Sequence, residues 1–491
     1  MKFGGTSVGD ASCIAKVAEI IRAASATSDI VVVVSAMSGV TNKLIEAATQ
    51  AEAGNREAIE TILTHLRQQH NVAADTLIHS DTQQKCFGEK MQKCFEEGER
   101  LCQGTMLLRE LTPRTRDSIS SLGERLSAPL VAAVLVESGV ASECIEATEL
   151  VVTDSYYGGA DPWMDLTSAA CEARLHPLLQ QGIVPVVTGF IGANEEGVLT
   201  TLGRGGSDYS ATILGAALDA DEVIIWTDVD GLLTADPRLV PSACTISEVS
   251  YREAAELAYF GAKVLHPKTL RPVMERGIPL RIRNTFEPEK PGTKITPTGT
   301  TNGGGVAAIT AISDAALIIL GGPGLTGVQD VLGRTFATAA AVRADVLLIS
   351  QSSSQNDICL VVSSAVAKRT VEALRHEFAH DLAHEKVEHI ALDSTVAIVT
   401  VVGQQVRMSG IVGRTFGALG RQNVDVIAIA HGASECNISF VVAKKDMKAA
   451  LVATHQEFQL GQLNSSMLPA ASPDGPATWS CETERASAEA D

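Results

Sequence analysis

The residues with the clearest capacity for chemistry include a glycine-rich stretch, T-T-L-G-R-G-G-S-D, at residues 200–208. An apolar run at 183–187 precedes it and a helix-like run at 209–218 follows it. A loop between a strand end and a helix start offers unpaired backbone N–H groups and the positive end of the helix dipole, which attract anions. Glycine also serves any turn that needs a positive φ, so the stretch alone fits an anion site or a structural loop equally well.

Further polar and charged residues stand at the ends of expected strands. The cations among them lie beside glycine loops, although the chain carries a formal net charge of −19. This balance argues against a general nucleic-acid or membrane surface and favours a specific anionic ligand. The sequence has no G-x-x-x-x-G-K-[ST] motif, which excludes a P-loop enzyme. The candidate residues are Lys2, Ser35, Thr41, Glu124, Arg204, Ser207, Asp208, Thr227, Asp228, Asp236, Arg238 and Lys263.

The elements that must position these residues alternate between strand and helix. Because the strand runs are continuously apolar, the pattern predicts an α/β fold whose parallel sheet is covered on both faces. Ligands of such a sheet bind at the carboxyl ends of its strands. Strands are expected at 2–3, 30–34, 183–188, 223–227 and 278–282, and helices at 10–24, from 41 onward, 163–181, 208–219 and 250–275.

Changes in composition divide the chain. Residues 1–297 form the first domain, within which the charged, alanine-rich stretch 55–110 has helical periodicity and is expected to be a helical insertion. A linker rich in glycine, proline and threonine follows. Residues 461–491 combine prolines with an acidic end, which is typical of a disordered tail.

An internal repeat occupies the region between the linker and the tail. G-R-T-F occurs at 333–336 and at 413–416, and S-Q-N-D-I-C-L-V-V at 354–362 matches S-E-C-N-I-S-F-V-V at 434–442. Both pairs are 80 residues apart. Two tandem copies of one small unit are therefore expected, at 306–388 and 394–460, each reading strand, helix, strand, strand, helix.

Two other patterns favour structural explanations. The stretch G-P-G-L-T-G at 322–327 formally matches a dinucleotide-binding fingerprint, but the second copy of the repeat lacks these glycines, which indicates a turn. His376, His380 and His384 have the spacing of a zinc-binding helix face. Charged residues surround them, so a solvated helix face explains them as well.

Cysteine usage and hydropathy indicate a cytoplasmic protein. The ten cysteines include no C-x-x-C pair, which is typical of reduced thiols. We find no secretory signal at the N-terminus and no apolar run of the roughly 18 residues that a membrane span needs. Neither nucleic acid nor a membrane is expected as a partner.

Seven motifs of the chain carry a family resemblance: K-F-G-G-T-S (2–7), V-S-A-M-S-G-V-T-N (34–42), G-E-R-L-S (123–127), T-G-F-I-G (188–192), T-T-L-G-R-G-G-S-D-Y-S-A (200–211), W-T-D-V-D-G (226–231) and F-G-A-K-V-L-H-P (260–267). Together, over about residues 1–460, they resemble those of the aspartate kinases. The resemblance implies an amino-acid-kinase fold, which is a three-layer αβα sandwich with a mainly parallel sheet, followed by two βαββαβ ACT-type regulatory units.

The reaction that the resemblance implies is transfer of the γ-phosphoryl group of ATP to the side-chain carboxylate of L-aspartate, giving 4-phospho-L-aspartate. This is the first step of lysine, threonine and methionine biosynthesis. A carboxylate with a pKa of about 4 is already ionised at neutral pH, so no strong base is needed. The site must instead offset repulsion between two anions, with cations, backbone N–H groups and Mg²⁺ that arrives with ATP.

Roles follow from the resemblance, position by position. Lys2 is the cation beside the transferring phosphoryl group, and Asp208 holds it in place. Glu124 pairs with the substrate ammonium and Arg204 clamps its α-carboxylate; without substrate, Arg204 would alternatively form a salt bridge to Glu124 or Asp208. The aspartate pocket further includes Ser35, Thr41, Phe190 and Ser207, and the nucleotide side includes Lys2, Gly4, Gly5, Thr227, Asp228, Asp236, Arg238 and Lys263.

Regulation is also implied by the resemblance. Threonine or lysine is expected to bind between ACT units around Gln351, Ser354 and His431, and to shift the enzyme towards a less active state. Assembly into a homo-oligomer through the ACT units is expected. No dehydrogenase domain is expected after the second unit, which implies a monofunctional enzyme.

Two alternatives stay open at this stage. Another kinase of the same family could phosphorylate a different carboxylate, because sequence patterns do not measure substrate length. The chain could also be a catalytically inactive amino-acid sensor that uses only its ACT pair. Retention of Lys2, Arg204, Asp208 and Lys263 together argues against the sensor.

Overall fold

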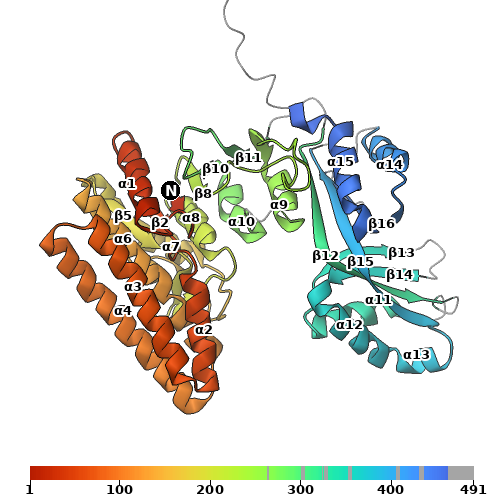
Figure 1. Cartoon of the computed structure of the whole chain (residues 1–491), viewed down its shortest axis with the longest axis horizontal. Coiled ribbons are helices and arrows are strands. Elements are labelled where there is room, and N and C mark those ends of the chain that lie inside the picture. Colours follow the sequence, from red (N-terminus) through yellow and green to blue (C-terminus); the bar gives the residue numbers. More distant parts are fainter. Residues whose placement is uncertain are drawn as a thin grey trace, which may run out of the picture.

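The computed structural model describes residues 1–261, 265–299, 305–322, 325, 330–351, 357–404, 410–430 and 436–462. Two parts are visible in Figure 1: an α/β part built from the first 299 residues, and a second part in which one sheet carries the internal repeat. Helix α9 (Tyr251–Tyr259) and strand β11 (Thr293–Thr296) lie where the two parts meet.

The α/β part is organised around an eight-stranded sheet with the order β3-β5-β2-β1-β8-β10-β11-β9. All its pairs are parallel except β10 with β11. The mainly parallel sheet predicted from the sequence is thus confirmed. Its remaining strands are β1 (Lys2–Phe3), β2 (Val32–Val34), β3 (Ser142–Ile145), β5 (Val184–Thr188), β8 (Val223–Thr227), β9 (Glu248–Ser250) and β10 (Leu280–Asn284).

Helices cover both faces of this sheet, as the central strand β2 illustrates. Val32 and Val34 pack into the core formed with α1 and α6, whereas Val33 packs into the core formed with α7, α8 and α10. The apolar strand runs follow from this double burial, and the three-layer sandwich is confirmed. The bounds are α1 (Ala11–Ser25), α6 (Leu122–Glu137), α7 (Met164–Gln180), α8 (Gly206–Ala217) and α10 (Pro267–Arg276).

Three long helices add a further layer outside α6. They are α2 (Val40–Ala53), α3 (Arg56–Leu77) and α4 (Asp81–Leu108), at the left of Figure 1. Arg67 of α3 reaches Glu99 of α4 at 3.1 Å, and both helices contribute apolar residues to the core on this face of the sheet.

One helical stretch in the described part of the chain, Pro113–Glu137, is long and apolar enough to cross a membrane by length and composition alone. This differs from the expectation that no such run exists. It comprises α5 (Pro113–Ser120) and α6, and 89% of its most apolar window is buried inside the protein. The stretch is therefore a core element of the sandwich.

Two expectations about local elements were wrong. The single helix expected at 250–275 is two helices, α9 and α10. Pro267 is the first residue of α10, and a proline disfavours helical geometry in the residue that precedes it, so the chain cannot continue as one helix through this point. The glycine-rich stretch does not follow β5 directly. A hairpin of β6 (Ile191–Asn194) and β7 (Leu199–Thr201) intervenes and joins β4 (Val152–Thr153) in a small separate sheet.

The internal repeat forms one six-stranded antiparallel sheet with the order β13-β14-β12-β15-β17-β16. In Figure 1 the helices of the first copy lie below this sheet and those of the second copy lie above it. The first copy comprises β12 (Ala308–Gly321), α11 (Val331–Ala341), β13 (Val346–Gln351), β14 (Asp357–Ser363), α12 (Ser364–Glu377) and α13 (Ala379–Ala383). The second comprises β15 (His389–Val402), α14 (Ile411–Arg421), β16 (Val426–Ala430), β17 (Asn437–Ala443) and α15 (Met447–Glu457).

The two copies share their long strands. Residues 315–321 of β12 pair with β14 of their own copy, whereas residues 308–312 pair with 398–402 of β15. Residues 396–402 of β15 in turn pair with β17. Each long strand therefore completes both units, and the linear division of the region at 388 and 394 does not follow the strand pairing.

The arginine of each G-R-T-F motif is a structural clamp. Arg334 Nε lies 2.7 Å from Glu377, and its guanidinium covers Phe378 and donates to the Glu377 carbonyl. Arg414 repeats these contacts with Glu457 and Phe458. The motif thus ties the first helix of each copy to the end of α12 in the first copy and of α15 in the second.

The other two patterns are only partly described. Gly322 lies just after β12, and the remaining glycines of 322–327 lie outside the described residues. The three histidines do not share one helix, because α12 ends at Glu377 and His380 lies in α13. His380 and His384 stack with ring centroids 4.1 Å apart.

Candidate active site

A cleft of about 1270 Å³ opens at the carboxyl ends of β1, β2 and β8. This is where an open parallel sheet binds ligands. Most of the candidate residues meet here although they come from distant parts of the chain. Those that line the cleft are Lys2, Gly4, Gly5, Ser35, Thr41, Glu124, Phe190, Arg204, Ser207, Asp208, Thr227 and Asp228.

The glycine-rich stretch owes its glycines to conformation and to close approach. Gly203 has φ 81°, and a Cβ there would lie 3.0 Å from the Gly158 carbonyl oxygen. Gly205 has φ 70°, and a Cβ there would lie 2.8 Å from the His266 Cβ. A larger residue at either position would strain the backbone and push these neighbours away. Arg204 is thereby held between two fixed turns.

Two helices begin at the cleft with open N-termini. Gly39 precedes α2 and Gly205 precedes α8, and neither residue supplies a side-chain hydrogen bond to the first turn. The Val40 and Gly206 N–H groups already donate to the carbonyls of Met37 and Gly203. The next N–H groups of each first turn, at 41–42 and 207–208, can bind a ligand, and both helix dipoles favour an anion. The two explanations left open for the glycine stretch thus hold together: the loop is structurally required and it presents an anion-binding helix end.

A buried ion pair occupies the floor of the cleft. Lys2 Nζ lies 2.5 Å from Asp208 Oδ1, and the two side chains are 9% and 15% exposed. Lys2 belongs to β1 in the middle of the sheet, and Asp208 belongs to the first turn of α8. The pair fixes a positive charge beside the glycine turn at Gly4 before any ligand binds.

Glu124 is a buried carboxyl in the first turn of α6. Burial raises its pKa to about 8, and the Ala36 N–H, the Lys2 charge and Ser207 oppose this only partly. Its Oε2 atom has no hydrogen-bond partner among the described residues. A buried acid with an unpaired oxygen is suited to receive a cationic group, which would favour its ionised form.

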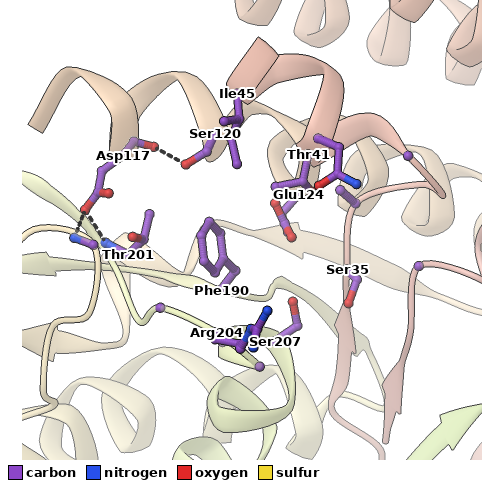
Figure 2. A pocket seen from close by; sticks show the side chains of 18 of the residues that line it. Ser35, Thr41, Ile45, Asp117, Ser120, Glu124, Phe190, Thr201, Arg204 and Ser207 are labelled. Atoms are coloured by element: carbon purple, nitrogen blue, oxygen red, sulfur yellow. Dashed lines mark hydrogen bonds between the residues drawn. The ribbon is translucent and has the colours of Figure 1, made fainter. Parts of the chain in front are cut away.

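Phe190 has a strained backbone. Its φ of 70° lies in the left-handed region, which costs a non-glycine residue about 1–3 kcal/mol. The conformation is held because the Phe190 N–H donates to Ser210 Oγ and the Leu202 N–H donates to the Phe190 carbonyl, each at 2.9 Å. Figure 2 shows the ring in the middle of the pocket, between Glu124 above and Arg204 and Ser207 below.

Arg204 is exposed at the edge of the pocket. It forms no ion pair within the described part of the chain, and the salt bridge to Asp208 or Glu124 that would have been the alternative is not formed, since Asp208 pairs with Lys2. Its guanidinium can therefore bind a carboxylate with two parallel N–H donors.

The nucleotide-side residues are divided by the structure. Thr227 ends β8 and Asp228 follows it, and both line the cleft, where Thr227 Oγ1 donates to Asp228 Oδ1 at 3.2 Å. Asp236 and Arg238 are not among the cleft-lining residues. They pair at 2.6 Å in a turn farther along the same loop. Lys263, Ser354 and His431 lie outside the described residues, and Gln351 ends the edge strand β13.

Sequence reasoning missed Asp117 and Arg116 of α5, which also line the cleft. Asp117 is buried, and its Oδ2 accepts hydrogen bonds from the N–H groups of Gly158 and Thr201 at 2.9 and 3.0 Å. The only local signal was an R-D pair a few residues before the G-E-R-L-S motif. Its partners lie 41 and 84 residues away, which no local pattern reveals.

Comparison with known proteins agrees with this arrangement. Residues 1–284 match the amino acid kinase family, and residues 318–378 and 399–458 match ACT domains. The chain is 34% identical over 470 residues to bifunctional aspartokinase/homoserine dehydrogenase 1 of Arabidopsis thaliana, covering 94% of this chain and 51% of that protein. It is 32% identical to aspartokinase 1 of the same plant, covering 95% and 81%.

The solved structures include E. coli aspartokinase III in complex with aspartate and ADP in the R-state. It matches with a TM-score of 0.76 and 29% identity, over 93% of this chain and 98% of that one. The chain spans about half the length of the bifunctional relatives that it matches. The chain belongs to the amino acid kinase family and, within it, to the aspartokinases with paired ACT domains.

Proposed function

We propose that this protein is an aspartate kinase that phosphorylates the side-chain carboxylate of L-aspartate with ATP and gives 4-phospho-L-aspartate. This is the first step towards lysine, threonine and methionine. The observation that carries the proposal is one cleft that combines the Lys2–Asp208 pair with Glu124 and an unpaired Arg204. An amino acid would present its ammonium to Glu124 and its α-carboxylate to Arg204. The Lys2–Asp208 pair lies where an anionic group would be transferred.

Substrate recognition follows from these charges. The guanidinium of Arg204 binds the α-carboxylate, and Glu124 binds the ammonium in its ionised form. Phe190 closes the pocket between them, and Ser35, Thr41 and Ser207 complete its wall. The side-chain carboxylate of aspartate then points towards Lys2.

Transfer needs stabilisation of charge more than it needs a base. Lys2 neutralises charge on the transferring group, and the open N-termini of α2 and α8 add backbone N–H donors. Gly4, Gly5, Thr227 and Asp228 form the nucleotide side of the cleft. Mg²⁺ would enter on the phosphates of ATP and supply further neutralising charge there.

Regulation belongs to the same proposal. E. coli aspartokinase III, a similar protein, has been solved with lysine and aspartate in the T-state. Lysine or threonine is the proposed effector here, bound by the ACT units near Gln351. Ile349, Ile427 and Ile429 are exposed on the edge strands β13 and β16, which supports pairing with a second copy of the chain.

The nine described cysteines are all free, which supports a cytoplasmic protein.

The alternatives are a kinase of another carboxylate and an inactive sensor. One assay separates them: acyl phosphate formed from ATP is trapped as a hydroxamate with aspartate or glutamate, with and without threonine and lysine. Aspartate should react at least about a hundredfold better than glutamate, because only one carboxylate position faces Lys2. Equal rates would favour another acceptor, and amino-acid binding without turnover would favour the sensor.

A further inference from the structure

Two loops hold Arg204 from one side, and they are joined to each other. The loop at 154–162 carries Gly158, whose carbonyl touches Gly203. The Ala160 N–H donates to the Thr201 carbonyl at 2.9 Å, which joins this loop to the end of β7. Movement of either loop would therefore move Arg204.

One carboxylate ties both loops to α5. Asp117 Oδ2 accepts from Gly158 at 2.9 Å and from Thr201 at 3.0 Å, and the residue is 3% exposed (Figure 2). Both donors are backbone N–H groups, and Thr201 stands only three residues before Arg204. Loss of the carboxylate would deprive these two N–H groups of this acceptor, which would raise the free energy of the present loop conformation.

Helix α5 is itself rigidly connected to Glu124. Thr112 caps its start, Ser120 Oγ donates to the Asp117 carbonyl at 3.1 Å, and the Ser121 N–H donates to the same carbonyl. The chain then enters α6, whose first turn carries Glu124. Asp117 thus connects the loops that carry Arg204 to the helices that carry Glu124, the two residues that would bind opposite charges of the substrate.

We propose that Asp117 is a positioning residue that fixes the Arg204 loop relative to Glu124 and so sets the affinity for the amino-acid substrate. The inference rests on the proposed function for its kinetic consequence. Its structural part, a tie between α5 and the loops at Gly158 and Thr201, does not depend on any activity. Asp117 itself touches neither charge of the substrate in this account.

The test compares Asp117→Ala and Asp117→Asn with a matched control, Glu253→Ala. Glu253 is another buried carboxylate that accepts a backbone N–H, in the capping box of α9, and it does not line the cleft. Asp117→Ala should raise KM for aspartate about tenfold or more, with KM for ATP within about threefold of wild type. Asp117→Asn keeps an oxygen that accepts both N–H groups and should restore most of the affinity. Glu253→Ala should lower Tm without changing KM for aspartate.

Hydrogen exchange of the unliganded proteins provides the second readout. Peptides covering 156–160 and 199–206 should exchange faster in Asp117→Ala than in wild type or Asp117→Asn. If Asp117→Ala does not fold, Asp117→Ser, too short to reach both donors, should give the same effects. Unchanged exchange and unchanged KM would overturn the inference, as would an equal rise of KM in Glu253→Ala. If wild type forms no acyl phosphate, the proposed function fails, while the exchange data still decide the tie.

Discussion

The two sides of the cleft are held by different parts of the chain. The aspartate side is fixed within the α/β part: Lys2 pairs with Asp208, Asp117 ties the Arg204 loop, and Ser127 Oγ donates to the Ser35 carbonyl at 2.7 Å. The nucleotide side continues from Asp228 into a loop that the second ACT domain holds. The aspartate side of the cleft is therefore positioned independently of the ACT domains, whereas the nucleotide side depends on contacts with them.

Hydrogen bonds and apolar packing attach this nucleotide-side loop to the second ACT domain. The Ile309 N–H of β12 donates to the Thr234 carbonyl at 2.8 Å, and Thr234 Oγ1 lies 3.0 Å from His455 Nε2 of α15. Ala235 and Val240 pack into the core of the second ACT domain. A structural change in that domain can therefore reach the loop after β8 directly. We expect regulation to alter nucleotide binding more than aspartate binding.

The largest expected effect is on Lys2, which belongs to the side that carries out transfer. Lys2→Ala removes the preorganised charge and leaves Asp208 without its partner. We expect kcat to fall about a hundredfold or more, with a much smaller change in KM for aspartate. Steady-state kinetics measure both; a normal kcat with a raised KM would move Lys2 from transfer to binding.

Arg204→Ala should raise KM for aspartate about tenfold or more, because the α-carboxylate loses two charge-assisted hydrogen bonds. Arg204→Lys keeps the positive charge but lacks the planar guanidinium, so its KM for aspartate should lie between those of Arg204→Ala and wild type. KM for ATP should stay within about threefold of wild type. A larger change for ATP than for aspartate would contradict the role given to Arg204.

Glu124 predicts proton release on substrate binding. Burial raises its pKa to about 8, so Glu124 is mostly protonated at pH 7 without ligand, and an ammonium beside it favours the carboxylate. Calorimetry at pH 7 in two buffers of different ionisation enthalpy should show release of most of one proton, and Glu124→Gln should abolish it. Equal proton release by this variant would exclude Glu124 as the source.

The same group affects stability with a defined sign. The folded state holds this proton more tightly than the unfolded chain, whose value is near 4.5. Its contribution is therefore fully present below about pH 4.5 and is lost as pH rises through about 8. Denaturant unfolding should show a free energy that falls less over this window in Glu124→Gln than in wild type.

The smallest effect concerns Thr234, on the nucleotide side. Thr234→Val removes a hydroxyl that contacts His455 and that also accepts the Cys244 N–H at 3.0 Å within the loop. A lost buried hydrogen bond is worth about 1 kcal/mol, so KM for ATP should rise about fivefold. Hydrogen exchange across 232–246 should increase in parallel, and an unchanged exchange rate would show that this contact does not hold the loop.

Much of this fold was predictable because local signals agreed with it. The valine run of β2 indicated a strand that is buried on both faces of the sheet. The 80-residue repeat indicated two similar structural units. The interlocking of β12 with β15 was not predictable, because either half of each strand satisfies the same apolar pattern. The split between α9 and α10 has a local signal in Pro267, because proline begins a helix readily and interrupts one that would continue through it.

The site shows the same limit. Lys2, Glu124 and Arg204 stand in distinctive motifs, and the fold brings them to one cleft at the carboxyl end of the parallel strands. Asp117 lacks such a signal because its partners are distant in sequence. Asp236 and Arg238 were expected on the nucleotide side; they pair with each other in a turn beyond the cleft-lining residues, and their role towards the nucleotide stays a prediction.

The most direct test of the difference between the two sides measures KM for aspartate and KM for ATP in Arg204→Ala and Thr234→Val side by side. The account predicts that the first variant raises only KM for aspartate and that the second raises only KM for ATP. If both variants changed the same constant, the two sides of the cleft would not be held independently, and the account would be wrong.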